Sequence, residues 1–272
     1  MQKLISYRSS ELLTGLHSQG KYFFTLNDVT SILPENTHSS VVKLVHDMIK
    51  RGLIMRVKEG LYNLIPYEQS SQTYFPNWHL TAEAMVQPKE HYIGFYSALG
   101  IHGLITQPAM VEQVVTKEQM HPQNKLVKNV RFEFMTLGEE RFFGYSKTWI
   151  DDFYKVNCSD PEKTFIDCLY MPDHGGGITE IAKAFYKSRE KIDPSRMQEY
   201  LEKFNVQAVY KRLGFMLEQL SLFPDLRNLI AGKITASYTP MDPSLPKKGN
   251  HYSKWKLIDN IDFRTVRHSL YT

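Results

Sequence analysis

Polar, hydroxyl-bearing and basic side chains gather in residues 36–64 of the chain. Short polar residues come first, from Asn36 to Ser40, and lysine or arginine then recurs up to Lys58. Hydroxyl groups can bond to any base, and lysine can donate to the acceptors of guanine. Lysine and arginine also neutralise phosphates, which positions a protein on a duplex without reading its sequence. These residue types therefore indicate binding to a nucleic acid.

A helix has to present these groups. Its apolar positions follow the i, i+3, i+4, i+7, i+8 spacing that places one helix face in a core, at Val41, Leu44, Val45, Met48 and Ile49. The stretch 41–51 is therefore predicted to be helical, and Gly52 ends it.

The segments around this helix complete a small module. Residues 53–64 predict a short basic hairpin that turns at Glu59-Gly60, and two further helices are predicted at 4–17 and 26–32. Thr25, with Asp28 three residues later, fits a partial capping box at the start of the second of these helices. The order of elements resembles a winged helix-turn-helix, with the third helix for recognition and the hairpin as its wing.

This resemblance implies contacts to DNA from the start of the third helix, from its outward face and from the hairpin. The free amides at the start of that helix also suit a phosphate. The predicted DNA-binding residues are Thr37, His38, Ser39, Ser40, Lys43, His46, Lys50, Arg51, Arg56 and Lys58. The alternative is a solvated helix face in a module that docks onto another protein, because winged helices of that kind also exist.

Length and charge agree with this interpretation. The 272 residues suffice for two domains, and the formal net charge is +4. Residues 1–66 hold eight basic against five acidic side chains, so most of the excess lies in this part, and a basic face suits a polyanion. The chain lacks a signal-peptide pattern and a long apolar run, so we expect a cytoplasmic protein without a membrane partner.

The rest of the chain predicts a larger mixed domain. Periodicity is lost at 67–78, which is predicted to be a linker between a domain at 1–66 and one at 79–272. We expect the α+β class overall. Helices are predicted near 79–85, 94–102, 161–171, 178–187, 194–204 and 206–220, strands at 113–116, 130–135 and 142–145, and an extended tail from Ile234.

The motifs that could indicate an enzyme are incomplete. His174-Gly175-Gly176-Gly177 resembles the oxyanion loop of some lipases, but no Gly-x-Ser-x-Gly nucleophile elbow accompanies it. Asp160, Glu162 and Lys163 resemble a nuclease cluster, yet they occupy one helical turn, where acids complement the helix dipole. We therefore expect no catalysis, no cofactor and no metal, with a nuclease as the weaker alternative. Cys158 and Cys168 are expected to be reduced core thiols.

Three blocks of the second part resemble the AbiEi family of antitoxins from type IV abortive-infection systems, which act in phage defence. The first block is Tyr92–Gln107, and the second is Ser159–Cys168 followed by Gly175–Glu180. The third is Leu213–Glu218, which precedes Met241–Pro243 and Lys254–Leu257.

The family resemblance implies a two-part antitoxin. Its winged helix would bind inverted repeats in the operator of its own operon and repress transcription. Its second domain would counter a nucleotidyltransferase-like toxin without needing a stable complex. The near balance of charge in residues 67–272 restricts a second DNA surface to a local basic patch, for which the candidates are Lys247, Lys248, Lys254 and Lys256, with Arg264 and Arg267. A stand-alone regulator or a protein-docking module without a toxin remains the alternative.

Overall fold

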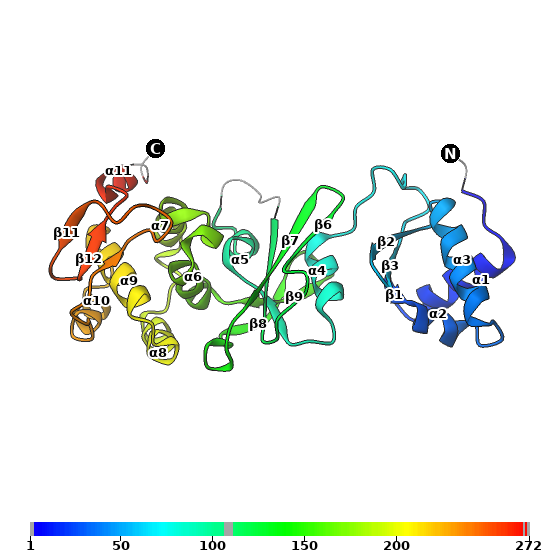
Figure 1. Cartoon of the computed structure of the whole chain (residues 1–272), viewed down its shortest axis with the longest axis horizontal. Coiled ribbons are helices and arrows are strands. Elements are labelled where there is room, and N and C mark those ends of the chain that lie inside the picture. Colours follow the sequence, from blue (N-terminus) through cyan, green and yellow to red (C-terminus); the bar gives the residue numbers. More distant parts are fainter. Residues whose placement is uncertain (1–2, 106–110, 269, 271–272) are drawn as a thin grey trace. The chain divides into compact units, whose positions relative to one another are not determined.

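A computed structural model describes residues 3–105, 111–268 and 270 (Figure 1). The chain divides into two compact units, and each has its own hydrophobic core. The first unit comprises residues 1–88 together with 125–131, and the second comprises 89–124 and 132–272. By this division the predicted linker at 67–78 and the helix that follows it fall within the first unit.

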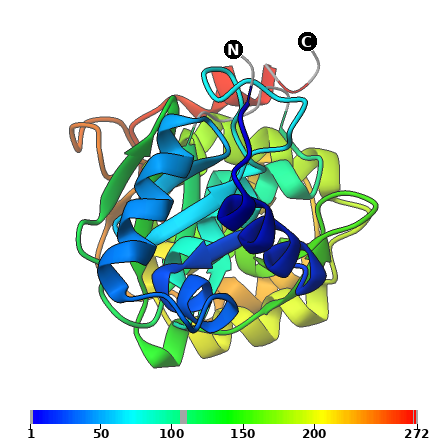
Figure 2. The same cartoon turned by 90° about the vertical axis from the view of Figure 1, so that its right-hand side faces the viewer.

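The first unit begins with three helices and a small antiparallel sheet. Strand β3 (Leu61–Leu64) is central in the order β1-β3-β2, between β1 (Phe23–Thr25) and β2 (Ile54–Lys58). The helices, at the front of Figure 2, are α1 (Tyr7–Ser18), α2 (Leu26–Ile32) and α3 (His38–Lys50). A fourth helix, α4 (Trp78–Val86), closes this unit.

Hydroxyl caps set the helix starts. Thr25 and Asp28 form the complete capping box of α2, in which the Thr25 amide donates to Asp28 Oδ2 over 2.8 Å. The predicted cap is therefore confirmed, and so are the bounds of that helix. Thr37 caps α3 by accepting from the Ser40 amide at 3.3 Å, so α3 starts three residues before its apolar stripe.

The core of the first unit is built from one face of each helix. Leu12 and Leu16 of α1, Val29 of α2 and Val41 and Met48 of α3 are all fully buried. They pack with Phe24, Ile54 and Leu64 of the sheet. The outward face of α3 is thereby left free of packing duties.

A six-stranded sheet, in the order β6-β7-β5-β4-β9-β8, opens the remainder of the chain. Its hairpins are antiparallel, but β4 pairs with β9 in parallel through Ile93 and Cys158. The strands are β4 (His91–Ile93), β5 (Val111–Thr116), β6 (Asn124–Val127), β7 (Val130–Thr136), β8 (Tyr145–Trp149) and β9 (Lys155–Ser159). The strand predicted at 142–145 is wrong, because Phe142 and Phe143 turn into the core before β8 begins.

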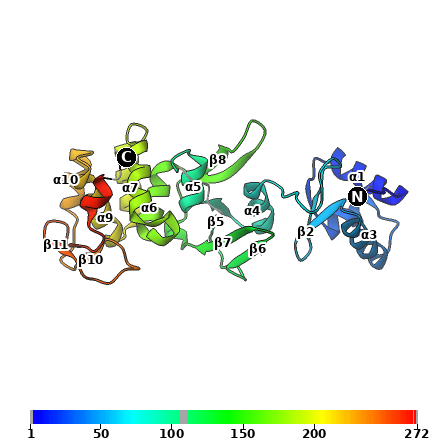
Figure 3. The ribbon, with the colours of Figure 1, turned by 90° about the horizontal axis from the view of Figure 1, so that it is seen from above.

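Helices complete the second unit and gather beyond α5 (Phe95–Ile101) at one end of it (Figures 1 and 3). They are α6 (Pro161–Tyr170), α7 (Gly177–Ser188), α8 (Pro194–Phe204), α9 (Gln207–Gln219) and α10 (Pro224–Ala231). Two short 3-10 turns lie at Glu139–Arg141 and Pro172–Gly175. The tail folds into β10 (Thr239–Pro240), β11 (Asn250–Tyr252), β12 (Leu257–Asp259) and α11 (Phe263–His268).

The predicted α+β class is confirmed, since helices and largely antiparallel sheets occur in separate stretches of the chain. Within the described residues, no helix is both long and apolar enough to cross a bilayer.

Candidate nucleic-acid interface

Helix α3 turns a polar, basic face away from the core. Lys43, His46 and Lys50 are exposed on it, whereas Val41, Val45 and Met48 are buried on the other side. Contacts of α3 with α1, α2 and β2 hold the helix in place. The fold thus presents the predicted recognition residues of α3 to solvent on a rigid support.

The cations of this face lack acidic partners. In the part of the chain that the structure describes, no ion pair involves Lys43, Lys50 or Arg56. Arg56 is exposed on β2, directly across the ladder from Tyr62. These three charges are therefore available to a polyanion, without first breaking an internal pair.

The start of α3 carries a cluster of hydroxyl groups. Thr37 Oγ1 lies 3.1 Å from Ser39 Oγ and 3.0 Å from Ser40 Oγ. His38 and Ser39 are exposed beside it. Hydroxyls and first-turn amides at a helix N-terminus suit either a base edge or a phosphate oxygen.

Two of the predicted contact residues are engaged inside the fold instead. The Arg51 guanidinium donates to Leu4 O at 3.1 Å, to Ser9 Oγ at 2.8 Å and to Asp47 O at 3.1 Å, so it ties the end of α3 to the start of α1. Lys58 Nζ donates to Met85 O of α4 at 2.6 Å. A DNA contact by either residue would compete with these bonds.

The hairpin of β2 and β3 is anchored by its inward side chains. Tyr62 is buried and packs against the Phe24 ring, with 5.7 Å between centroids, so it belongs to the core and not to the exposed face. The turn at Glu59-Gly60 uses a positive φ of 72° at Gly60, a conformation that favours glycine. The hairpin therefore projects its tip and Arg56 outward.

The predicted C-terminal patch is only partly available. Lys247 and Lys248 are exposed in the loop before β11. Lys254 forms an ion pair with Glu218, and Lys256 lies over the Tyr238 ring at 5.6 Å. Arg264 and Arg267 are exposed on α11. Compensation of Lys254 leaves this patch weaker than the face of α3.

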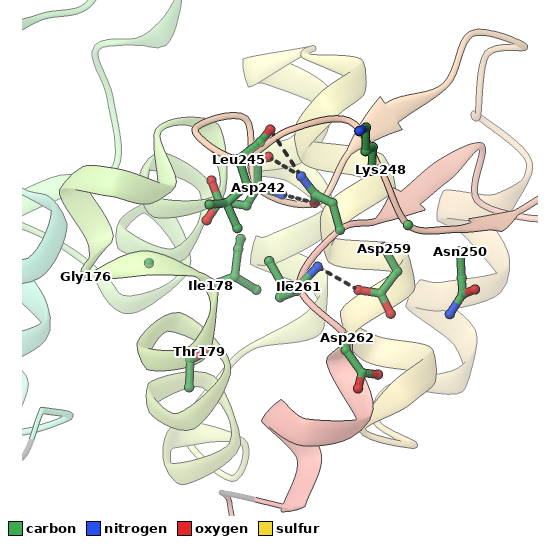
Figure 4. A pocket seen from close by; sticks show the side chains of 13 residues that line it. Gly176, Ile178, Thr179, Asp242, Leu245, Lys248, Asn250, Asp259, Ile261 and Asp262 are labelled. Carbon is green, nitrogen blue, oxygen red and sulfur yellow. Dashed lines mark hydrogen bonds between the residues drawn. The ribbon is translucent and has the colours of Figure 1, made fainter.

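A concavity of about 680 Å³ lies in the second unit beside the start of α7 (Figure 4). Its carboxylates already serve the surrounding turns. Asp242 accepts from the Ser244 amide and hydroxyl at 2.9 and 2.6 Å, and Asp259 accepts from the Phe263 amide at 3.0 Å. Gly176 and Gly177, both at positive φ, lead into α7. The glycine run predicted to be a turn before a helix has that structural role.

The acidic-lysine cluster at the start of α6 is also occupied by structure. Asp160 caps the helix through the Lys163 amide at 2.9 Å, and Glu162 accepts from the Asp193 amide at 2.7 Å. Lys163 pairs with Asp167, and it donates to the Tyr92 hydroxyl at 2.9 Å. Burial lowers the pKa of Lys163 and raises the pKa of Tyr92, because loss of water disfavours both charged forms.

This buried network satisfies its own groups, and the side chains of Lys163 and Asp167 have no exposed surface, so it offers nothing to a substrate. Both cysteines are free and buried, as predicted. Among the described residues, no group of three or more histidine, cysteine or acidic side chains is placed to hold a metal ion.

Comparison with known proteins adds a similarity of fold. No family model and no curated protein matches the chain. A similar solved structure is that of the RV2827C protein from Mycobacterium tuberculosis, with a TM-score of 0.74 and 12% sequence identity. The match covers 99% of this chain and 97% of that one. At this identity the likeness concerns the fold alone.

Proposed function

We propose that residues 1–66 form a winged helix-turn-helix that binds DNA, with α3 in the major groove and the β2–β3 hairpin as its wing. The observation that carries the proposal is the outward face of α3, where a hydroxyl cluster at the helix start leads into Lys43 and Lys50, which have no acidic partners. Recognition helices read bases with their N-terminal residues, so Thr37 to Lys43 are assigned to base edges. Lys50 and Arg56 are assigned to phosphates.

The proposed activity is transcriptional autorepression. Two copies of the module would occupy inverted half-sites whose centres lie a whole number of helical turns apart, in units of about 10.5 bp. A protein bound there blocks the promoter sterically. The proposal includes no catalytic step, because the candidate acidic and glycine motifs serve the fold.

We further propose that the second unit makes the chain an antitoxin against a nucleotidyltransferase-like toxin. The support is the resemblance of three sequence blocks, of which residues 106 and 107 lie outside the described residues. The blocks meet in the core of this unit: the Tyr92 hydroxyl donates to Asp167 at 2.9 Å, and Trp255 packs onto Gly214. The resemblance thus concerns the residues that build this unit.

A gel-shift titration with the DNA upstream of the gene tests the DNA-binding proposal. We expect Lys43→Ala to weaken binding about ten-fold, because a lost base contact costs roughly 1–3 kcal/mol. Lys191→Ala, which removes one exposed lysine of the second unit, is the matched control and should bind like the wild type. Unchanged DNA binding by a chain lacking residues 1–66 would refute the proposal.

Growth of cells that express the adjacent toxin gene tests the antitoxin proposal. The wild type and Lys43→Ala should both restore growth when transcribed from an unrelated promoter, because the second unit is intact in both. Failure of the wild type to restore growth would leave a stand-alone regulator as the function.

A further inference from the structure

An open groove of about 410 Å³ runs along strand β2 in the first unit. One wall is formed by residues 55–59, which belong to the wing proposed above. The other wall comes from residues 125–128, more than sixty positions later in the sequence, in the turn that joins β6 to β7. Both walls lie in the same compact unit.

The groove is rich in cations. Arg56 and Lys58 line it from β2, and Lys125 and Lys128 line it from the turn, against a single acidic residue, Glu59. In the described chain no ion pair involves Arg56 or Lys125. The sequence from 119 to 132 contains no acidic residue, which was the available signal for a basic segment here.

Hydrogen bonds hold both walls in place. Lys128 Nζ donates to Ser71 O at 3.0 Å, to Gln72 O at 3.4 Å and to Tyr74 O, so it fastens the turn to the loop before α4. These partners are neutral carbonyls, which leave the positive charge of Lys128 in place. Lys58 fastens β2 to α4 through Met85 O. The cations are thus positioned before any ligand arrives.

The shape and chemistry of the groove fit a phosphate backbone. It is open along its length, and its rim carries long cationic side chains, with Leu126 exposed beside them. Strand β2 also contacts α3, so the groove adjoins the element assigned to the major groove.

We propose that the groove between β2 and the β6–β7 turn binds DNA phosphates, with Lys125 extending the contact beyond α3 and the wing. This inference rests on the proposed DNA-binding function and adds a segment that lies outside residues 1–66. Because phosphates carry no sequence information, Lys125 should contribute equally to operator and to unrelated duplexes.

Fluorescence anisotropy with the full-length protein tests the proposal on two labelled duplexes, the upstream DNA and a scrambled version of it. We expect Lys125→Ala to weaken binding to both by about five-fold, the effect of roughly one exposed charge contact. The slope of log K against log salt concentration should fall by about 0.9. Lys125→Arg, which keeps the charge, should retain both the affinity and the slope.

Lys191→Ala removes the same charge from the second unit and controls for net charge. If Lys125→Ala and Lys191→Ala behave alike while Lys43→Ala weakens binding to the upstream DNA, the groove proposal is wrong and the DNA-binding function stands. That result would favour an acidic protein segment as the occupant of the groove. If the wild-type protein binds neither duplex, the proposed function fails and the inference fails with it.

Discussion

Arg51 and Arg56 are five residues apart, and the sequence assigns both to DNA. In the structure Arg51 closes three hydrogen bonds inside the fold, whereas Arg56 is exposed and unpaired within the described chain. Two of the partners of Arg51, Leu4 and Ser9, lie more than forty residues earlier. Residue type and local spacing cannot reveal such a contact, because it depends on how α1 crosses α3.

The two arginines should therefore respond differently to removal. Arg51→Ala is expected to lower the free energy of unfolding by about 1–3 kcal/mol, because it leaves the buried Ser9 hydroxyl and its neighbours without a charged donor. Arg56→Ala should change stability by less than about 0.5 kcal/mol and weaken DNA binding instead. Urea unfolding and gel shift on both variants decide this. Equal stability of the two would return Arg51 to the set of DNA contacts.

At the scale of elements, the sequence predicts best where a helix has both a cap and an apolar stripe. The bounds of α2 and α8 match their prediction, because Thr25 and Asp193 cap them and Pro34 and Asn205 follow. The α3 prediction finds the right face but starts late, because its first turn is polar. Short strands such as β4 and β6 are missed, since three or four residues show no clear alternation and their pairing partners are distant.

The capping box of α2 gives a pH-dependent contribution to stability. Partial burial opposes ionisation of Asp28, but bonds from Lys21 and Thr25 outweigh it and hold the pKa of Asp28 below its ordinary value of 3.8. This stabilisation is therefore complete above that value and is lost as the pH falls through the lower, folded-state pKa.

Asp28→Asn should consequently cost about 1 kcal/mol at neutral pH, because it removes the charged acceptor of the cap. The difference from the wild type should shrink in acid, once the native carboxyl is protonated. Urea unfolding of both proteins across the acidic range measures this. A difference that stays constant with pH would show that the charge of Asp28 contributes nothing to stability.

Helix α9 depends on one close approach. A Cβ at Gly214 would lie 2.2 Å from the Trp255 ring, which is fully buried. Gly214→Ala should therefore destabilise the protein by about 1–3 kcal/mol or more, because the indole has to move in a packed core. Gly232→Ala, at the end of α10, is the control: its nearest atom would be 3.5 Å away. Thermal unfolding should show a loss for the first variant and no loss for the second.

At the scale of the molecule, two separate hydrophobic clusters carry the two compact units. Leu16 lies in the first cluster and Leu169 in the second, and both side chains are fully buried. The sequence predicts two parts with distinct cores. It does not predict that residues 125–131 join the first part, because no local pattern records a return of the chain.

Truncation of one leucine should weaken mainly its own unit. Leu16→Ala and Leu169→Ala are each expected to cost about 2–5 kcal/mol, the range for large-to-small changes in a core. Hydrogen exchange of backbone amides, followed along the sequence, should show faster exchange chiefly in the first unit for Leu16→Ala and in the second for Leu169→Ala. Uniform acceleration throughout by either variant would mean that the two cores unfold as one.

The return of residues 125–131 to the first unit means that a single cut cannot separate the two parts of this protein. A fragment that stops at residue 88 loses the ammonium group that gathers the carbonyls of Ser71, Gln72 and Tyr74. Insertions or shortenings between β6 and β7 would therefore alter the module at the other end of the sequence. Mutations that tune operator affinity can arise in the middle of the gene as well as at its start.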